Sequence, residues 1–173
     1  MKFQFDDGGR GEAGYKGKTG DCVTRTIAIA AGKPYQEVYD ALNNLAVSER
    51  KGKRKRGISS ARTGVYRTSY EKYLLSLGWE WTPLMQIGQG CKVHLREGEL
   101  PSEGRFVVSL SRHCTAVIDG VIHDTYDPSR DGTRCVYGYY SPRQKSLTTS
   151  KEHLCANPLC RATIASMTEG WRR

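Results

Sequence analysis

The sequence lacks long hydrophobic runs. No apolar stretch approaches the roughly 20 residues that a membrane-spanning helix needs, and residues 1–14 show no apolar core of a secretory signal peptide. Hydrophobic residues make up only 38% of the 173 residues, which suits a single domain with a modest core and substantial loops. From these absences we expect a cytoplasmic protein without a membrane partner.

Cysteine is also infrequent, with six residues in the chain. Because disulfides are rare in the cytosol, we expect all six thiols to be free. Cys91, Cys114 and Cys135 lie in apolar, strand-like stretches. Cysteine in such a context is typically an unreactive core residue.

No complete set of metal ligands stands out. His153, Cys155 and Cys160 are of the types that bind zinc, but a fourth ligand would have to come from elsewhere. Incidental cysteines on a surface tail are the favoured interpretation. These residues fall in a polar stretch, residues 141–173, which we expect to extend a domain formed by residues 1–140. We predict neither a metal nor a cofactor.

Negative charge is scarce, because 18 acidic residues face 27 Lys and Arg and leave a formal charge of +9. A basic loop is predicted over residues 48–67, and six of the seven residues 50–56 are Lys or Arg. Such a run is typical of a solvated loop, and it can also bind an acidic protein or nucleic acid. The sequence shows no RNA-binding signature, so nucleic acid is the second choice of partner. The residues expected to make contact are Lys53, Arg54, Lys55 and Arg56.

Helices precede strands along the chain. Apolar residues recur at helical spacing after Cys22, after Pro34, and between Thr68 and Gly78. Short runs rich in β-branched and aromatic residues follow, as is typical of strands. The predicted strands cover residues 79–82, 91–95, 105–110, 113–118, 121–126 and 134–140. Helices followed by an antiparallel sheet predict an α+β fold, whereas residues 1–20 lack periodicity and predict an irregular lead-in.

Two helix starts carry capping signals. Asp21 precedes the first helix, where its carboxylate is expected to accept the backbone N–H of Thr24. Thr68 and Glu71 have the spacing of a capping box at the start of the third helix. Gly32 follows the first helix and is expected to end it.

A β-hairpin is predicted around Asp119–Gly120, a dipeptide typical of two-residue turns. Counting back from this turn pairs His113 with Tyr126 and places His113 and Asp124 on one face, as diagonal neighbours. His123 and Asp127 fall on the opposite face. The hairpin therefore predicts a hydrogen bond between His113 and Asp124.

The combination of Cys22, His113 and Asp124 predicts an activated nucleophile. Cysteine reacts as the thiolate, which a helix N-terminus and a nearby imidazolium both stabilise. His113 would supply the imidazolium and later protonate the leaving group, while Asp124 would orient the imidazole. The backbone N–H of Cys22 and one more donor from the lead-in would form an oxyanion hole.

Two segments resemble a known family. GDCVTRTIAIAAGKPYQEVY, residues 20–39, resembles the opening helix of small papain-like cysteine-peptidase-fold proteins of bacteria and phages, and HCTAVIDGVIHDTYDP, residues 113–128, resembles their histidine and acid strands. More distant similarity is to bacteriocin-leader peptidases and NlpC-type amidases. The resemblance implies a papain-like fold with Cys22 as nucleophile, His113 as base and Asp124 as orienting acid, and the host cytoplasm as the location of a phage-encoded protein.

The segment before the cysteine departs from this family. Papain-like peptidases usually place a glutamine there as an oxyanion-hole donor, and residues 15–19 contain none. Two alternatives follow: Lys18 or Thr19 takes its place, or the oxyanion hole is incomplete.

Three functions remain open on this evidence. The first is a cysteine-dependent hydrolase of amide, isopeptide or thioester bonds, acting on a protein or peptide substrate, with the basic loop favouring an acidic one. The second is a non-catalytic papain-fold module that binds nucleic acid or an acidic protein through the basic loop. The third is a transferase that passes the acyl group to an amine with the same three residues.

Overall fold

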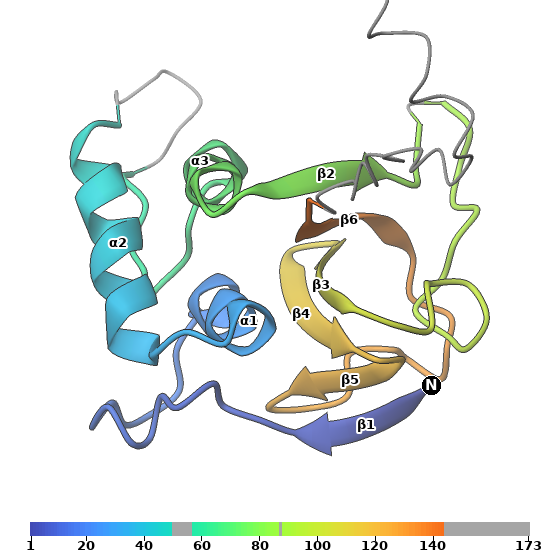
Figure 1. Ribbon diagram of the computed structural model, residues 1–173, viewed down its shortest axis with the longest axis horizontal. Coiled ribbons are helices and arrows are strands. Elements are labelled where there is room, and N and C mark those ends of the chain that lie inside the picture. The colour runs from blue at the N-terminus through green and yellow to red at the C-terminus, as the bar shows by residue number, and fades with distance from the viewer. Residues whose placement is uncertain (50–56, 87, 144–173) are drawn as a thin grey trace, which may run out of the picture. The chain divides into compact units, whose positions relative to one another are not determined.

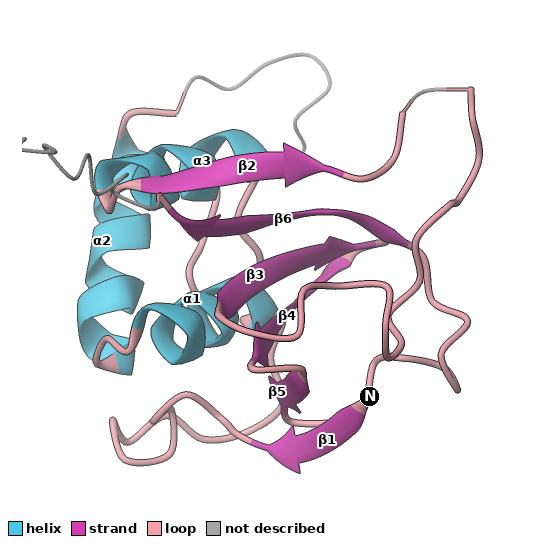
Figure 2. Cartoon of the chain, turned by 45° about the vertical axis from the view of Figure 1, so that its right-hand side comes forward, coloured by secondary structure: helices cyan, strands magenta, loops and turns pink. Residues whose placement is uncertain are grey.

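A computed structural model describes residues 1–49, 57–86 and 88–143. The helices lie on one side of a twisted sheet (Figure 1). Figure 2 shows the strands fanning from β2 to β1 with the helices along one flank. The helices are α1 (Cys22–Ala31), α2 (Tyr35–Val47) and α3 (Arg67–Ser76), and the strands are β1 (Lys2–Phe5), β2 (Trp79–Pro83), β3 (Arg105–Leu110), β4 (His113–Ile118), β5 (Val121–Asp124) and β6 (Val136–Pro142).

The strands form one six-stranded sheet in the order β1-β5-β4-β3-β6-β2. Every neighbouring pair is antiparallel except β1 and β5, which run parallel. Helices followed by a mostly antiparallel sheet confirm the predicted α+β class.

The β4–β5 hairpin has the register that the Asp119–Gly120 turn predicts. Val117 pairs with Ile122, and Ile118 pairs with Val121. Both turn residues have positive φ, 47° at Asp119 and 74° at Gly120, as a type I′ turn requires. Local sequence therefore sets the pairing that brings His113 toward Asp124.

The helix boundaries agree with the prediction better than the caps do. α1 begins at Cys22, and Gly32 ends it in the left-handed conformation at φ 62°. Asp21 is the residue before α1, but its side chain makes no capping hydrogen bond, so that part of the prediction is wrong. The capping box is also wrong, because α3 begins at Arg67 after Tyr66 and has no side-chain cap.

The inner strands of the sheet are buried on both faces. One apolar cluster joins the helices to the sheet, and the other lies against the segment that precedes β3. Successive side chains of β3 point to opposite faces of the sheet. Val107 therefore belongs to the first cluster, whereas Phe106 and Val108 belong to the second. This double burial explains why β3 and β4 are almost continuously apolar.

Two strand assignments are wrong. The lead-in contains β1, which was predicted to be irregular; its four residues are exposed and pair with β5 through the backbone. The predicted strand at residues 91–95 is a loop that makes only an isolated bridge, between His94 and Cys135. Short segments of this kind depend on a partner strand more than on their own side chains.

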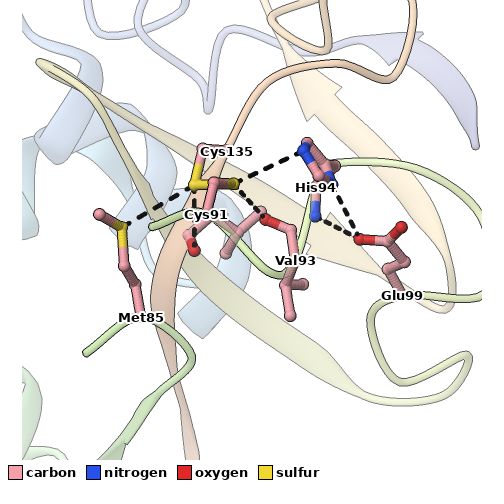
Figure 3. Close-up of a disulfide and its surroundings, with 7 residues drawn as sticks. Met85, Cys91, Val93, His94, Glu99 and Cys135 are labelled. Atoms are coloured by element: carbon pink, nitrogen blue, oxygen red, sulfur yellow. Dashed lines mark hydrogen bonds and ion pairs between the residues drawn. A yellow bond between two sulfur atoms is a disulfide. The ribbon is translucent and has the colours of Figure 1, made fainter. Parts of the chain in front are cut away.

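A disulfide joins Cys91 to Cys135, with 5.8 Å between their Cα atoms. The expectation of free thiols is therefore wrong for this pair, and Cys91 is exposed rather than in the core. Figure 3 shows His94 beside it, with Nε2 3.6 Å from the Cys91 sulfur and Nδ1 3.3 Å from Oε2 of Glu99. Cys114 is a free, buried thiol, as predicted.

Some predictions concern residues outside those that the structure describes. They include the four basic contact residues Lys53, Arg54, Lys55 and Arg56, and the group His153, Cys155 and Cys160. The described residues form a compact unit, Met1–Arg143. Within the described ranges, no helix has the length and apolarity needed to cross a membrane.

Candidate active site

Three secondary-structure ends bring the predicted catalytic residues together. Cys22 is the first residue of α1, His113 is the first of β4, and Asp124 is the last of β5. α1 lies against β4 and β5 (Figure 1). The fold thus assembles residues that are 91 positions apart in the case of Cys22 and His113 (113 − 22).

His113 and Asp124 form a buried pair. His113 Nε2 lies 2.7 Å from Oδ2 of Asp124, and the two residues are 8% and 4% exposed. Burial disfavours the imidazolium, but the hydrogen bonds with Asp124 and Cys22 outweigh it and raise the pKa of His113 to about 9. Burial likewise opposes the Asp124 carboxylate, yet the bond with His113 holds its pKa below the ordinary value.

The Cys22 thiol lies beside His113, and both residues line the same cavity. Nε2 of His113 faces Asp124, and the other ring nitrogen, Nδ1, is approached by the Tyr126 hydroxyl at 3.4 Å. Burial alone would raise the pKa of Cys22, but His113 and the backbone N–H of Cys114 together lower it. The arrangement therefore favours the thiolate form of Cys22 more than a free thiol in water would be favoured.

Tyr126 covers the imidazole and was not predicted as a site residue. Its hydroxyl lies 3.4 Å from Nδ1 of His113, and the two rings are 5.2 Å apart between centroids. The hairpin count that pairs His113 with Tyr126 is the signal that could have identified it.

A buried ion cluster lies next to the three residues. Asp21, 1% exposed, has its Oδ2 2.9 Å from Arg10 Nε and its Oδ1 3.3 Å from Arg25 Nε. The Tyr35 hydroxyl donates to Oδ2 of Asp21 at 2.7 Å. Arg25 also approaches Asp124, with 3.9 Å between Nη2 and Oδ1.

The cluster explains the failed N-cap, because Asp21 is committed to two arginines instead. A carboxylate beside a thiol normally opposes its ionisation, and here that charge is compensated by Arg10 and Arg25. The Asp21 to Arg25 spacing of four residues on a helix was a readable signal for one of these pairs. Arg10 lies in the lead-in, where no pattern pointed to it.

Two of the three catalytic candidates line a cavity of about 500 Å³, and Asp124 is not among its lining residues. Cys22 and His113 line it, together with Tyr126. The other lining residues come from the segment before α1 and α1 itself, from the loop before α3 and α3 itself, and from β3, its following turn and β4: Thr19, Gly20, Val23, Arg25, Thr63, Gly64, Val65, Arg67, Tyr70, Ser109, Leu110, Arg112 and Cys114.

The oxyanion-hole candidates differ in how they lie. The Cys22 backbone N–H is at the first turn of α1, where no helical acceptor exists. Thr19 lines the cavity, but its hydroxyl donates to the carbonyl of Arg62. Lys18 is exposed and is not among the lining residues. Of the three, the Cys22 N–H is the donor left available.

Gly20 lets two cavity segments approach. A Cβ at this position would lie 2.9 Å from the carbonyl oxygen of Thr63, which is too close for backbone atoms. Only glycine therefore permits the observed spacing between the segment before Cys22 and the loop before α3.

We looked for metal-binding groups at this site and compared the chain with known proteins. Within the described residues, no group of three or more His, Cys, Asp or Glu side chains could hold a metal ion. The sequence matches no protein-family model, and no curated protein or solved structure is significantly similar to the chain.

Proposed function

We propose that the protein is a cysteine-dependent hydrolase of papain-like type that cleaves an amide, isopeptide or thioester bond. The observation that supports it is the placement of the Cys22 thiol at the wall of a cavity beside His113, which itself pairs with Asp124 at 2.7 Å. Buried ionisable groups are costly unless they are paired. A site that keeps several of them beside a thiol is typical of catalysis.

The reaction would proceed in two steps. The Cys22 thiolate attacks the substrate carbonyl, and the imidazolium of His113 donates its proton to the leaving group, which gives a thioester. The neutral imidazole then takes a proton from water, whose oxygen attacks the thioester and releases the acid. In both steps the oxyanion of the tetrahedral intermediate would accept a hydrogen bond from the backbone N–H of Cys22.

The neighbouring residues have positioning parts in this scheme. Asp124 orients the imidazole through Nε2. Arg25 contacts Asp124 and donates to the Thr125 hydroxyl at 2.8 Å, so it holds the end of β5 against α1. Precise placement of this kind accounts for a large part of enzymatic rate.

Cleavage of a peptide library tests the proposal. The protein is incubated with peptides derived from a bacterial proteome, and new N-termini are identified by mass spectrometry. We expect cleavages that Cys22→Ala abolishes and that Cys114→Ala, the matched thiol variant, retains. Cleavage that survives in Cys22→Ala, or a wild type that cleaves nothing, contradicts the proposal.

Adding hydroxylamine to the same reaction separates hydrolysis from transfer. Products that gain only the mass of water indicate hydrolysis, as we expect. Products that carry the amine in preference to water at low amine concentration indicate a transferase.

A further inference from the structure

The cavity beside Cys22 is lined by cations. Arg25, Arg67, Arg112 and His113 all contribute to its wall, and no Asp or Glu belongs to the described residues that line it. A single-sign lining with low-dielectric walls concentrates ligands of the opposite charge.

Two of these cations are already compensated. Arg25 belongs to the buried cluster in which Arg10 and Arg25 face Asp21 and Asp124, two positive charges against two negative ones. His113 lies beside Cys22, and its charge favours the thiolate form of that residue, which would compensate it. The positive potential that remains comes from Arg67 and Arg112.

Arg67 is held at the side of the cavity. Its guanidinium lies over the Trp81 ring, 4.1 Å from the centroid. Burial opposes its charge, but the Tyr140 hydroxyl and Glu71 favour it and raise its pKa. Because Glu71 already attracts Arg67, this arginine is in part compensated as well.

Arg112 differs from the other three. It occupies the turn between β3 and β4, directly before His113, and has a positive φ of 54° that is uncommon for a residue with a side chain. Among the described residues it has no hydrogen-bond or ion-pair partner, and it is exposed. A strained backbone position that presents an unpaired guanidinium beside the reacting groups is typical of a functional site.

We infer that the substrate carries a carboxylate near the bond that is cleaved, and that Arg112 is the residue that recognises it. The inference rests on the proposed function and specifies its substrate class as an acidic acyl or peptide group. Arginine presents two parallel N–H donors that match a carboxylate. The charge of Arg112 acts in the cavity itself.

Two alkylating reagents test the charge preference without a known substrate. Iodoacetate is anionic and iodoacetamide is neutral, and both react in the same way. The Cys22 sulfur forms a bond to the CH₂ carbon, and iodide leaves with the electron pair of the C–I bond. The ratio of the two rate constants at Cys22, measured by mass spectrometry of the Cys22 peptide, reports the potential at the sulfur.

Arg112→Gln is the test variant and Arg130→Gln is its matched control. Arg130 is also exposed and also has a positive φ, 53°, but it does not line the cavity. A unit charge at the wall of a partly solvated cavity changes the rate of a charged reagent by about three- to tenfold. We expect Arg112→Gln to lower the iodoacetate to iodoacetamide ratio by this factor, and Arg130→Gln to leave it within about 1.5-fold.

The outcomes distinguish this inference from the proposed function. An unchanged ratio in Arg112→Gln, or an equal fall in both variants, overturns the inference even when iodoacetamide reacts rapidly at Cys22. A Cys22 that reacts with iodoacetamide no faster than a free thiol counts against the proposed function, while the ratio still reports on Arg112. A wild-type ratio that falls toward that of a free thiol as salt is added supports the inference.

Discussion

Replacing His113 by alanine should raise the pKa of the Cys22 thiol. In the folded protein the imidazolium and the Cys114 N–H lower this pKa against the effect of burial. Without the imidazole, burial dominates and the pKa moves to or above the ordinary thiol value of about 8.5. The pH profile of iodoacetamide alkylation at Cys22 should therefore shift to higher pH in His113→Ala.

The size of the effect is largest in mild acid. At pH 5.5 an ordinary thiol is only about 0.1% thiolate, so a lowered pKa can increase the thiolate population by up to about 1000-fold. A stabilised thiolate is less nucleophilic, with a Brønsted coefficient of about 0.4–0.5, and this removes part of the gain. We expect His113→Ala to slow alkylation of Cys22 at pH 5.5 by about tenfold or more.

The assay follows each cysteine separately by peptide mass spectrometry, with the urea-unfolded protein as the reference for a free thiol. Cys114 does not compete, because burial raises the pKa of its thiol to about 12. If wild type and His113→Ala have the same profile, and both follow the unfolded reference, His113 does not activate Cys22. The nucleophile hypothesis would then be abandoned.

Three further predictions concern the hairpin, the acid pair and the disulfide. Asp124→Asn should lower peptide cleavage by tenfold or more, because the imidazole of His113 loses the group that orients it. Asp127→Asn should leave cleavage unchanged, because the Asp127 side chain only accepts a hydrogen bond from the backbone N–H of Ser129. Equal effects in the two variants would contradict the hairpin argument. The lowered pKa of Asp124 means that its carboxylate stabilises the fold above about pH 4, its unfolded value, and that this stability is lost as pH falls through the folded pKa. Urea unfolding at pH 7 and pH 3 should accordingly show a smaller acid loss in Asp124→Asn, and an identical loss in wild type and variant would count against it. Cys91→Ser removes a disulfide that closes a loop of 44 residues and should lower the free energy of unfolding by up to about 4 kcal/mol. If added reductant does not change the denaturant midpoint of the wild type, the disulfide is contradicted.

The local sequence determined the elements that depend on short-range patterns. β3 and β4 occupy the predicted residues, and α1 begins at Cys22 and ends before Gly32, because periodicity and a left-handed glycine act within a few residues. The hairpin register follows from Asp119–Gly120 for the same reason. From that register alone, His113 and Asp124 could be placed within hydrogen-bond reach, which the 2.7 Å contact confirms.

Only the tertiary structure decided the features that join distant segments. β1 exists because β5 supplies its backbone partners, and its own four residues carry too little pattern to predict it. Cys91 and Cys135 become a disulfide because the chain brings them together across 44 positions. Asp21 lies at the predicted N-cap position, but its carboxylate forms ion pairs with Arg10 and Arg25. Two cations stabilise a buried carboxylate more than one backbone N–H does. The residue types of the site were legible in the sequence, whereas its electrostatics depend on burial and on charges from other segments, which folding alone brings together.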